Sequence, residues 1–321
     1  MSTGTNVKLK VTDPFLHPAL FYRGEQEYLA GTLTFVRGAL AAGDPVAVAV
    51  PGPRLELLRG ALGADADRVH LLDMQIAGRN PGHIIPGVLR AFADAHPDAG
   101  RVWIIGEPIW AGRSPLEYPA CVQHEALINL AFAGRTVSIL CPYDAEALDP
   151  VVLADAAVTH PVLVGRGGEQ VSDAYAPEQI VQTYNQPLPQ ARPAFGAVAV
   201  LAFDARNLTQ VRRFAAEEAA RIGLAADRIG ELEVAVNELA ANSLVHGGGS
   251  GVLRVWADSD HLICEISDTG HLTDLLAGRR PAGLSSRGGR GLLLVHHICD
   301  LLRIHTTPAG TAIRSHFALS G

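Results

Sequence analysis

The sequence predicts an α/β protein of two domains joined by a linker, and three observations carry that prediction. A chain of 321 residues exceeds the usual size of one domain, so we expect two domains that each bury a core. In the first half, short β-branched runs alternate with amphipathic helices, which is typical of a parallel sheet covered on both faces. Residues 166–193 are rich in Pro and Gly, which predicts an extended linker with one helical turn at 177–181.

Four strands and four helices are expected in the first half, residues 1–165. The strands are the apolar runs at 46–50, 69–72, 102–105 and 137–140, and the helices cover about 25–40, 54–62, 84–95 and 115–132. Ligands of such sheets bind beyond the carboxyl ends of the strands. The first of these ends, residues 51–54, reads Pro-Gly-Pro-Arg and lacks the Gly-Lys-Ser/Thr of a P-loop, so we expect no nucleotide site of that type here.

Three segments of this half resemble the MEDS sensory domain, a RecA-like module of bacterial regulators. They are residues 17–22, 40–46 and 124–129. The resemblance covers residues 14–163 and implies a RecA-like parallel α/β sheet that senses a small molecule. The polar candidates for a sensing pocket are His17, Glu107, His124, Glu125, Cys141 and His160. Since the sequence fixes no geometry for them, it predicts no metal ion in this half.

The second half carries a polar row that an ordinary core helix would not have. Glu238, Asn242 and His246 are spaced four residues apart, so one face of a helix would hold all three. The same segment has a separate apolar set that can face a core. An amide oxygen is a suitable ligand for Mg²⁺, and a carboxylate can deprotonate a hydroxyl group. The row therefore indicates a site that binds a polar ligand.

Two further blocks follow this row. An alternating run at 262–267 predicts a strand that ends at Asp268-Thr269-Gly270. An aspartate at a strand end can accept a hydrogen bond from the exocyclic amine of adenine, and Gly270 permits close approach of the backbone. Glycines and arginines over 278–291 would offer backbone donors and cations to phosphate, ahead of an apolar helix predicted at 292–302.

These blocks closely resemble the nucleotide-binding boxes of the GHKL ATPase superfamily, over about residues 195–321. The resemblance implies the Bergerat/GHKL ATPase fold, an α+β two-layer sandwich, for residues 194–321, with ATP and Mg²⁺ as cofactors. It implies that Glu238 is catalytic, that Asn242 holds Mg²⁺ and that Asp268 binds adenine. The other implied nucleotide-binding residues are His246, Gly270, Gly288, Gly289, Arg290, Gly291 and Thr311. One departure is Leu272, which stands where the first glycine box usually has its second glycine.

Within this superfamily the chain resembles the anti-sigma-factor serine kinases, which share the small domain, the Glu before the Asn, and arginines in the opening helix, here Arg212 and Arg213 at 208–222. The resemblance implies a signalling and transcription regulator: an ATP-dependent protein serine/threonine kinase that binds a sigma factor and phosphorylates an anti-anti-sigma protein of the STAS type. A small-molecule signal would control it. Two alternatives stay open: a non-catalytic ATP-binding module that sequesters a partner, and an atypical sensor histidine kinase, although the opening helix has no His.

Composition argues against several other classes. A net charge of −7 argues against a general nucleic-acid-binding surface. The four cysteines lie far apart without a CxxC pattern, so neither a disulfide scaffold nor a zinc motif is predicted. The first residues lack the apolar stretch of a signal peptide, and no run reaches the length of a membrane span. We therefore expect a cytoplasmic chain away from the membrane, and a homodimer stays open.

Overall fold

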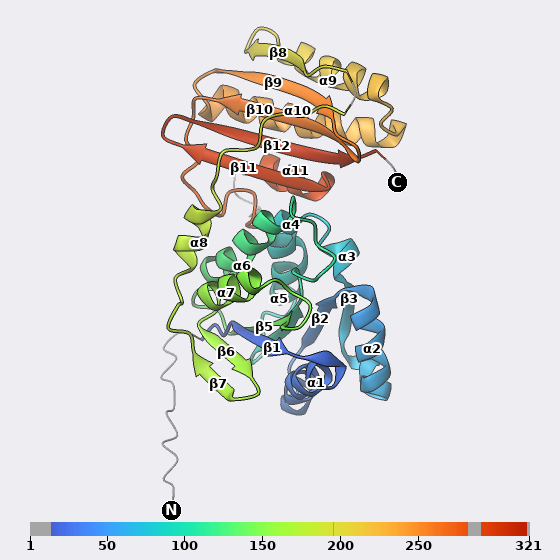
Figure 1. Cartoon of the computed structure of the whole chain (residues 1–321), viewed down its shortest axis with the longest axis vertical. Helices are drawn as coiled ribbons and strands as arrows, with labels where there is room; N and C mark the ends of the chain where they lie inside the picture. Colours follow the sequence, from blue (N-terminus) through green and yellow to red (C-terminus); the bar gives the residue numbers. More distant parts are fainter. Residues whose placement is uncertain (1–13, 195, 282–289, 320–321) are drawn as a thin grey trace, which may run out of the picture.

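The computed structural model describes residues 14–194, 196–281 and 290–319. The chain forms two sheets, each with its own helices, which follow one another along the long axis of the molecule (Figure 1). The first sheet has seven strands in the order β3-β2-β4-β5-β1-β6-β7, and the second has five in the order β11-β12-β10-β9-β8. The predicted fold class, a parallel α/β sheet followed by an α+β sandwich, is confirmed.

The first sheet belongs to the N-terminal domain, and all its strands but the last are parallel. The strands are β1 (Pro18–Tyr22), β2 (Val46–Val50), β3 (His70–Asp73), β4 (Val102–Gly106), β5 (Val137–Asp144), β6 (Val162–Gly165) and β7 (Gly168–Val171), with β7 antiparallel to β6. Sequence reasoning missed β1 and β6, although β1 lies between β5 and β6 inside the sheet. β1 begins with Pro18 and β6 directly follows Pro161, and proline usually argues against a central strand.

Helices cover both faces of this sheet. One face packs against α1 (Gly24–Ala42) and α2 (Gly52–Leu62), and the other packs against α4 (Pro81–Ile84), α5 (Ala91–Asp94), α6 (Tyr118–Phe132) and α7 (Pro150–Thr159), while α3 (Met74–Ala77) follows β3. The helix predicted at 84–95 is present over residues 81–94, but it is not a regular α-helix throughout. A π-helical turn, Ile85–Arg90, separates α4 from α5, because Pro86 has no N–H for a regular helical hydrogen bond.

The C-terminal domain is an antiparallel sheet with helices on one face. Its strands are β8 (Ala199–Asp204), β9 (Ser250–Ala257), β10 (His261–Asp268), β11 (Leu301–Thr307) and β12 (Gly310–Ala318), and its helices are α9 (Leu208–Ile222), α10 (Ala226–His246) and α11 (Arg290–Ile298). The helix predicted to reach residue 302 ends at Ile298, because Leu301 and Leu302 already belong to β11. Among the described residues, no helix combines the length and the apolar character that would let it span a bilayer.

The segment predicted as a linker contains regular structure. It includes β7 and α8 (Pro177–Thr183), the latter at the predicted helical turn. It then runs across the outer face of the second sheet, where the Arg314 guanidinium donates to the carbonyl oxygen of Pro189 over 2.8 Å. The backbone N–H of Ala194 donates to the carbonyl oxygen of Ala257, also over 2.8 Å. The domain bounds 1–165, 166–193 and 194–321 stay a prediction.

The two domains touch where α4 lies against α11 and β11 (Figure 1). The buried Asn80 side chain, just before α4, donates from Nδ2 to the carbonyl oxygen of Cys299 over 3.3 Å. Beside it, Arg79 Nε lies 2.9 Å from Asp300 Oδ1. A buried amide without a partner would be costly, so this contact fixes how the two domains meet.

Candidate functional site

A cavity of about 440 Å³ lies in the C-terminal domain, between α10, the end of β10 and the start of β12. The predicted site residues that line it are Asn242, His246, Asp268, Gly270, Gly291 and Thr311. Glu238 and Arg290 line a neighbouring cavity instead. Gly288 and Gly289 lie outside the described residues. The structure thus brings residues from most of the predicted sequence boxes together around one cavity.

Asp268 ends β10 and is held by two hydrogen bonds. The Ser243 hydroxyl on α10 donates to Oδ2 over 2.5 Å, and the Gly270 N–H donates to Oδ1 over 2.9 Å. Each carboxylate oxygen keeps acceptor capacity for a ligand in the cavity. Sequence reasoning missed the buried Ser243, whose only signal is its place one residue after Asn242, on the side of the helix that turns toward the sheet.

Glycines let the end of α10 approach the end of β10. A Cβ added to Gly247 would lie 2.4 Å from the carboxylate carbon of Asp268, and one added to Gly270 would lie 2.5 Å from the carbonyl oxygen of His246. Gly310 has a φ of +153°, and its added Cβ would lie 2.6 Å from the carbonyl oxygen of Asp268. Any side chain at these positions would push the walls of the cavity apart.

A chain of hydroxyl groups ties β12 to the loop that follows β10. Thr311 Oγ1 donates to the carbonyl oxygen of Gly270 over 2.8 Å and lies 2.7 Å from Thr306 Oγ1. Thr306 Oγ1 in turn accepts the N–H of Leu272 over 2.9 Å. His271 and Leu272 stand where the first glycine box usually has its last two residues, and both line the cavity.

Glu238 lies beside the nucleotide-sized cavity rather than in it. It lines a second cavity of about 630 Å³, together with Arg290 and residues of the N-terminal domain that include His83 and Pro86. Gly291 lines both cavities, and a Cβ added to it would lie 2.4 Å from Glu238 Oε2. The carboxylate and the first cavity are therefore separated by a residue without a side chain.

The loop at 271–281 lines the first cavity and also contacts the N-terminal domain. Leu276 is 2% exposed and belongs to the same buried cluster as Met74 and Ile84 of the first domain. Arg279 is also buried, and this burial lowers the pKa of its guanidinium to about 10, with the Cys121 thiol acting in the opposite direction. One face of this loop thus touches the cavity, while the other is anchored in the neighbouring domain.

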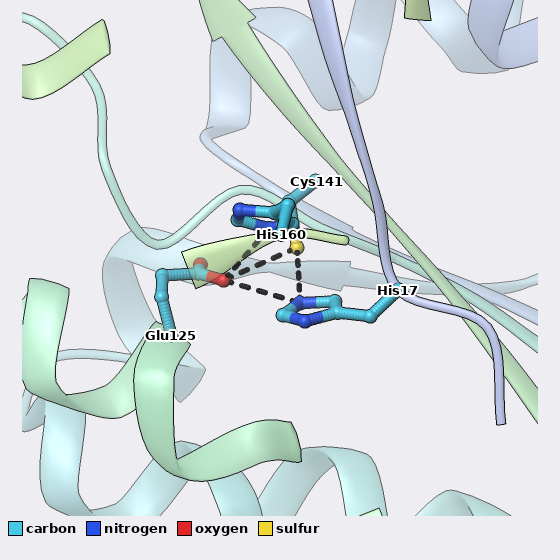
Figure 2. A group of neighbouring side chains, drawn as sticks. All are labelled: His17, Glu125, Cys141 and His160. Atoms are coloured by element: carbon cyan, nitrogen blue, oxygen red, sulfur yellow. Dashed lines mark hydrogen bonds and ion pairs between the residues drawn. The ribbon is translucent and has the colours of Figure 1, made fainter. Parts of the chain in front are cut away.

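In the N-terminal domain, His17, Glu125, Cys141 and His160 converge in a fully buried cluster (Figure 2). Glu125 Oε2 lies 3.4 Å from His17 Nε2, 3.3 Å from His160 Nε2 and 3.4 Å from Cys141 Sγ. Burial opposes ionisation of Glu125, but the contacts with His160 and His17 hold its pKa below the usual range. Burial also lowers the pKa of His17 to about 4.

The other two sensing candidates lie outside this cluster. Glu107 follows β4 and accepts the Tyr28 hydroxyl over 3.4 Å. Burial raises the pKa of Glu107 to about 8, although the nearby Arg54 guanidinium opposes this shift. Arg54 itself pairs with Asp144 over 3.2 Å, so Glu107 belongs to a separate polar group at the carboxyl ends of the strands. His124 is buried, and its Nδ1 has no hydrogen-bond partner among the described residues.

The C-terminal domain thus combines an antiparallel sheet, helices on one face of it and a polar helix row beside a cavity, as expected of a histidine kinase-like ATP-binding domain. The family model described as "Histidine kinase-like ATPase domain" matches residues 201–317. The model described as "MEDS: MEthanogen/methylotroph, DcmR Sensory domain" matches residues 16–161. The chain therefore carries a MEDS sensory domain followed by a histidine kinase-like ATPase domain, as predicted.

Comparison with whole proteins adds little to this assignment. Among solved structures, the RsbU and RsbW domains of Rv1364c from Mycobacterium tuberculosis match with 18% identity over 38% of this chain and a TM-score of 0.29. The match spans 32% of that chain. Among curated proteins, none matches this sequence. The family models therefore provide the identification.

Proposed function

We propose that the chain is a signalling regulator that binds ATP with Mg²⁺ in its ATPase domain and transfers the γ-phosphate to a serine of a partner protein. The observation that carries the proposal is the convergence of Asn242, Asp268 and Thr311 on one cavity, with Glu238 one helical turn away. The proposed partners are an anti-anti-sigma protein of the STAS type as substrate and a sigma factor as binding partner. Both follow from the resemblance to anti-sigma-factor kinases.

The residues around the first cavity fit a nucleotide. Asp268 would accept a hydrogen bond from the adenine amine, and the Thr311 hydroxyl holds Gly270 close beside that position. The Asn242 side chain lines the same cavity, and its amide oxygen suits Mg²⁺, which keeps several waters and bridges substrate phosphates. When bound, Mg²⁺ would neutralise charge on the phosphate groups.

Glu238 lines the second cavity, and in this proposal it acts on a hydroxyl that enters from there. The carboxylate would accept the proton of the serine hydroxyl, while the serine oxygen attacks the γ-phosphorus and ADP leaves. Gly291 leaves the path between the two cavities free of a side chain. The substrate would therefore approach along α11, on the side that faces the sensory domain.

The sensory domain can control both cavities through contacts that already exist. His83, Pro86 and Gly87 line the cavity beside Glu238, so they limit what can reach the carboxylate. Leu276 joins the core of the sensory domain to the loop of the nucleotide cavity. A small molecule that shifts α4 would therefore alter substrate access and nucleotide binding together.

A second candidate is a partner-sequestering module that binds ATP without transferring its phosphate. The observation that favours it is the position of Glu238, which does not line the nucleotide-sized cavity. The apolar Leu272 in the cavity wall, where the family usually has glycine, points the same way. The two candidates share nucleotide binding and differ only in phosphotransfer.

One experiment separates them. The full chain is incubated with Mg²⁺ and γ-labelled ATP in a cytoplasmic extract of its source bacterium, and the proteins that it captures are mapped for phosphosites. The proposal expects serine phosphate on a captured partner, lost with Glu238→Ala and kept with Glu233→Ala on the same helix. Capture without phosphate would favour sequestration, and acid-labile phosphate on the chain itself would show a histidine kinase.

A further inference from the structure

The sensory domain contains a group of side chains that the nucleotide site does not use. His17 precedes β1, Cys141 lies on β5, His160 precedes β6 and Glu125 projects from α6 (Figure 2). Their exposed fractions are 0–1%. Four different elements thus bring imidazole, thiol and carboxylate groups to one point, and the potential ligand atoms all lie within 4.8 Å of one another.

Four of the six distances between the ligand atoms of this group match those around a tetrahedral ion, and the other two are at most 4.8 Å. Cys141 Sγ lies 3.4 Å from both His17 Nε2 and Glu125 Oε2, and Glu125 Oε2 lies 3.4 Å and 3.3 Å from the two imidazole Nε2 atoms. Around tetrahedral zinc, ligand atoms stand about 3.3–3.6 Å apart, given the usual zinc–nitrogen, zinc–oxygen and zinc–sulfur bond lengths. We propose that the His17, Glu125, Cys141 and His160 cluster binds one Zn²⁺ ion.

Hydrogen bonds outside the cluster orient both imidazoles for this role. His160 Nδ1 lies 2.9 Å from the carbonyl oxygen of Ala156, and His17 Nδ1 lies 3.1 Å from Asn129 Oδ1. The assignment of Oδ1 is supported by Asn129 Nδ2, which donates to the carbonyl oxygen of Thr159 over 2.8 Å. Because both partners are acceptors, each Nδ1 carries a proton, and in the neutral ring Nε2 then offers a lone pair.

These lone pairs face a carboxylate, which is unfavourable unless a positive charge lies between them. Two extra protons would make both rings cationic at a place without solvent, and burying charge in this way is costly. One Zn²⁺ instead balances the Glu125 carboxylate and the Cys141 thiolate, with both imidazoles neutral. The complex has no net charge, and its formation releases the thiol proton to solvent.

The types of ligand atom, and the fact that four protein side chains fill the site, both favour Zn²⁺. Sulfur, nitrogen and oxygen ligands in one four-coordinate group suit Zn²⁺, and a site closed by four protein ligands is typical of structural zinc. The ion would hold β1, β5, the start of β6 and α6 together. This inference does not depend on the nucleotide site, which lies in the other domain.

The first test measures metal in the full chain, purified under reducing conditions without chelator. We expect one Zn²⁺ per chain, and removal of the ion should lower the melting temperature by at least about 5 °C. Replacement with Co²⁺ should give the absorption of a tetrahedral site together with a thiolate-to-cobalt charge-transfer band. A chain that binds neither ion, or a cobalt spectrum without that band, overturns the proposal even if no variant folds.

Variants then locate the ion. Cys141→Ser should abolish the charge-transfer band, whereas Cys121→Ser, at an equally buried thiol on α6, should keep it. Asn129→Ala, which removes the partner of His17, should weaken zinc binding about 10–100-fold. A second ligand group, Asp258, His261 and His316, lies in the ATPase domain. Loss of zinc with His261→Ala but not with Cys141→Ser would also overturn the proposal.

Discussion

Both domains bring polar side chains together between a helix and a sheet. In the ATPase domain these side chains line an open cavity, whereas in the sensory domain they are closed off from solvent. In the ATPase domain, Asn242 and Asp268 line a cavity of about 440 Å³. In the sensory domain, Glu125 and Cys141 lie in a cluster where the exposed fraction of each side chain is at most 1%. Open polar groups can exchange water for a ligand, whereas closed ones must satisfy one another or hold a resident ion.

This difference predicts two kinds of mutational effect. A side chain that lines an open cavity can be changed with little loss of folded stability, because water replaces its contacts, so the effect falls on ligand binding or catalysis. A closed polar group has no such replacement, so the effect falls on stability. The following predictions test that division, starting with the largest expected effect.

The strongest test is Glu238→Ala. If this carboxylate takes the proton of the substrate hydroxyl, phosphotransfer should fall about 10²–10⁴-fold, while ADP affinity and melting temperature stay unchanged. Asn242→Ala, one turn along α10, should instead weaken the Mg²⁺-dependent part of nucleotide binding. Transfer assays and calorimetry on both variants measure the split. If both variants bind and react like the native chain, the polar row of α10 has no role in the reaction.

Leu276 belongs to both kinds of environment. Its side chain is buried against the core of the sensory domain, and it also lines the cavity of the ATPase domain. Leu276→Ala should lower the free energy of unfolding by about 2–5 kcal/mol and should also weaken nucleotide binding. Leu275→Ala is the matched control, since Leu275 is 44% exposed while Leu276 is 2% exposed. Urea unfolding and calorimetry would report the two effects. Equal, small effects of both substitutions would argue against coupling through this loop.

Glu107→Gln tests a closed group through pH. The pKa of Glu107 is raised to about 8 in the folded chain, so the folded state keeps a proton that the unfolded state releases above its lower pKa. The stabilisation is complete at low pH and is lost as pH rises through about 8, a change on the order of 3 kcal/mol between pH 5 and 8.

The glutamine variant carries no such proton, so its free energy of unfolding should be less dependent on pH. Urea unfolding at several pH values compares it with the native chain and with Glu56→Gln, whose side chain is exposed on α2. Phosphotransfer at a fixed pH should not change, since Glu107 touches neither cavity. An unchanged pH dependence in Glu107→Gln would mean that this carboxyl is ionised in the folded chain.

The sequence predicts a feature well when that feature depends on residues that are close together in the chain. The spacing of Glu238, Asn242 and His246 placed them on one helix, because a helical period is a local property, and the order of the boxes placed Asp268 and Thr311 at the same cavity. The identities of both domains followed from such local patterns. Most strands of the parallel sheet were also found from continuous apolar runs.

Features that depend on distant partners were out of reach. Leu275 and Leu276 look alike in the sequence, yet only Leu276 is buried, because the other domain covers it. Asn80 meets Cys299 across 219 positions. The metal candidates were all visible as polar residues, but their convergence requires β1 and β6, two of the strands that periodicity did not detect.

The smallest predicted effect concerns the base of the nucleotide. In Asp268→Asn, one acceptor oxygen becomes an amide donor, yet Ser243 and the Gly270 N–H both donate to this side chain. The Ser243 hydroxyl can donate to the carbonyl oxygen of Leu239 and accept the new amide N–H, so the bond that is lost is the one from the adenine amine to this side chain, which should weaken ATP and ADP binding by about 1–3 kcal/mol. Guanine carries an acceptor at the position of that amine, so the variant should also discriminate less between ATP and GTP. Ser243→Ala removes a donor without changing the carboxylate, and it should keep the preference for adenine. Calorimetry with both nucleotides decides the matter: native affinity and native selectivity in Asp268→Asn would place the base elsewhere.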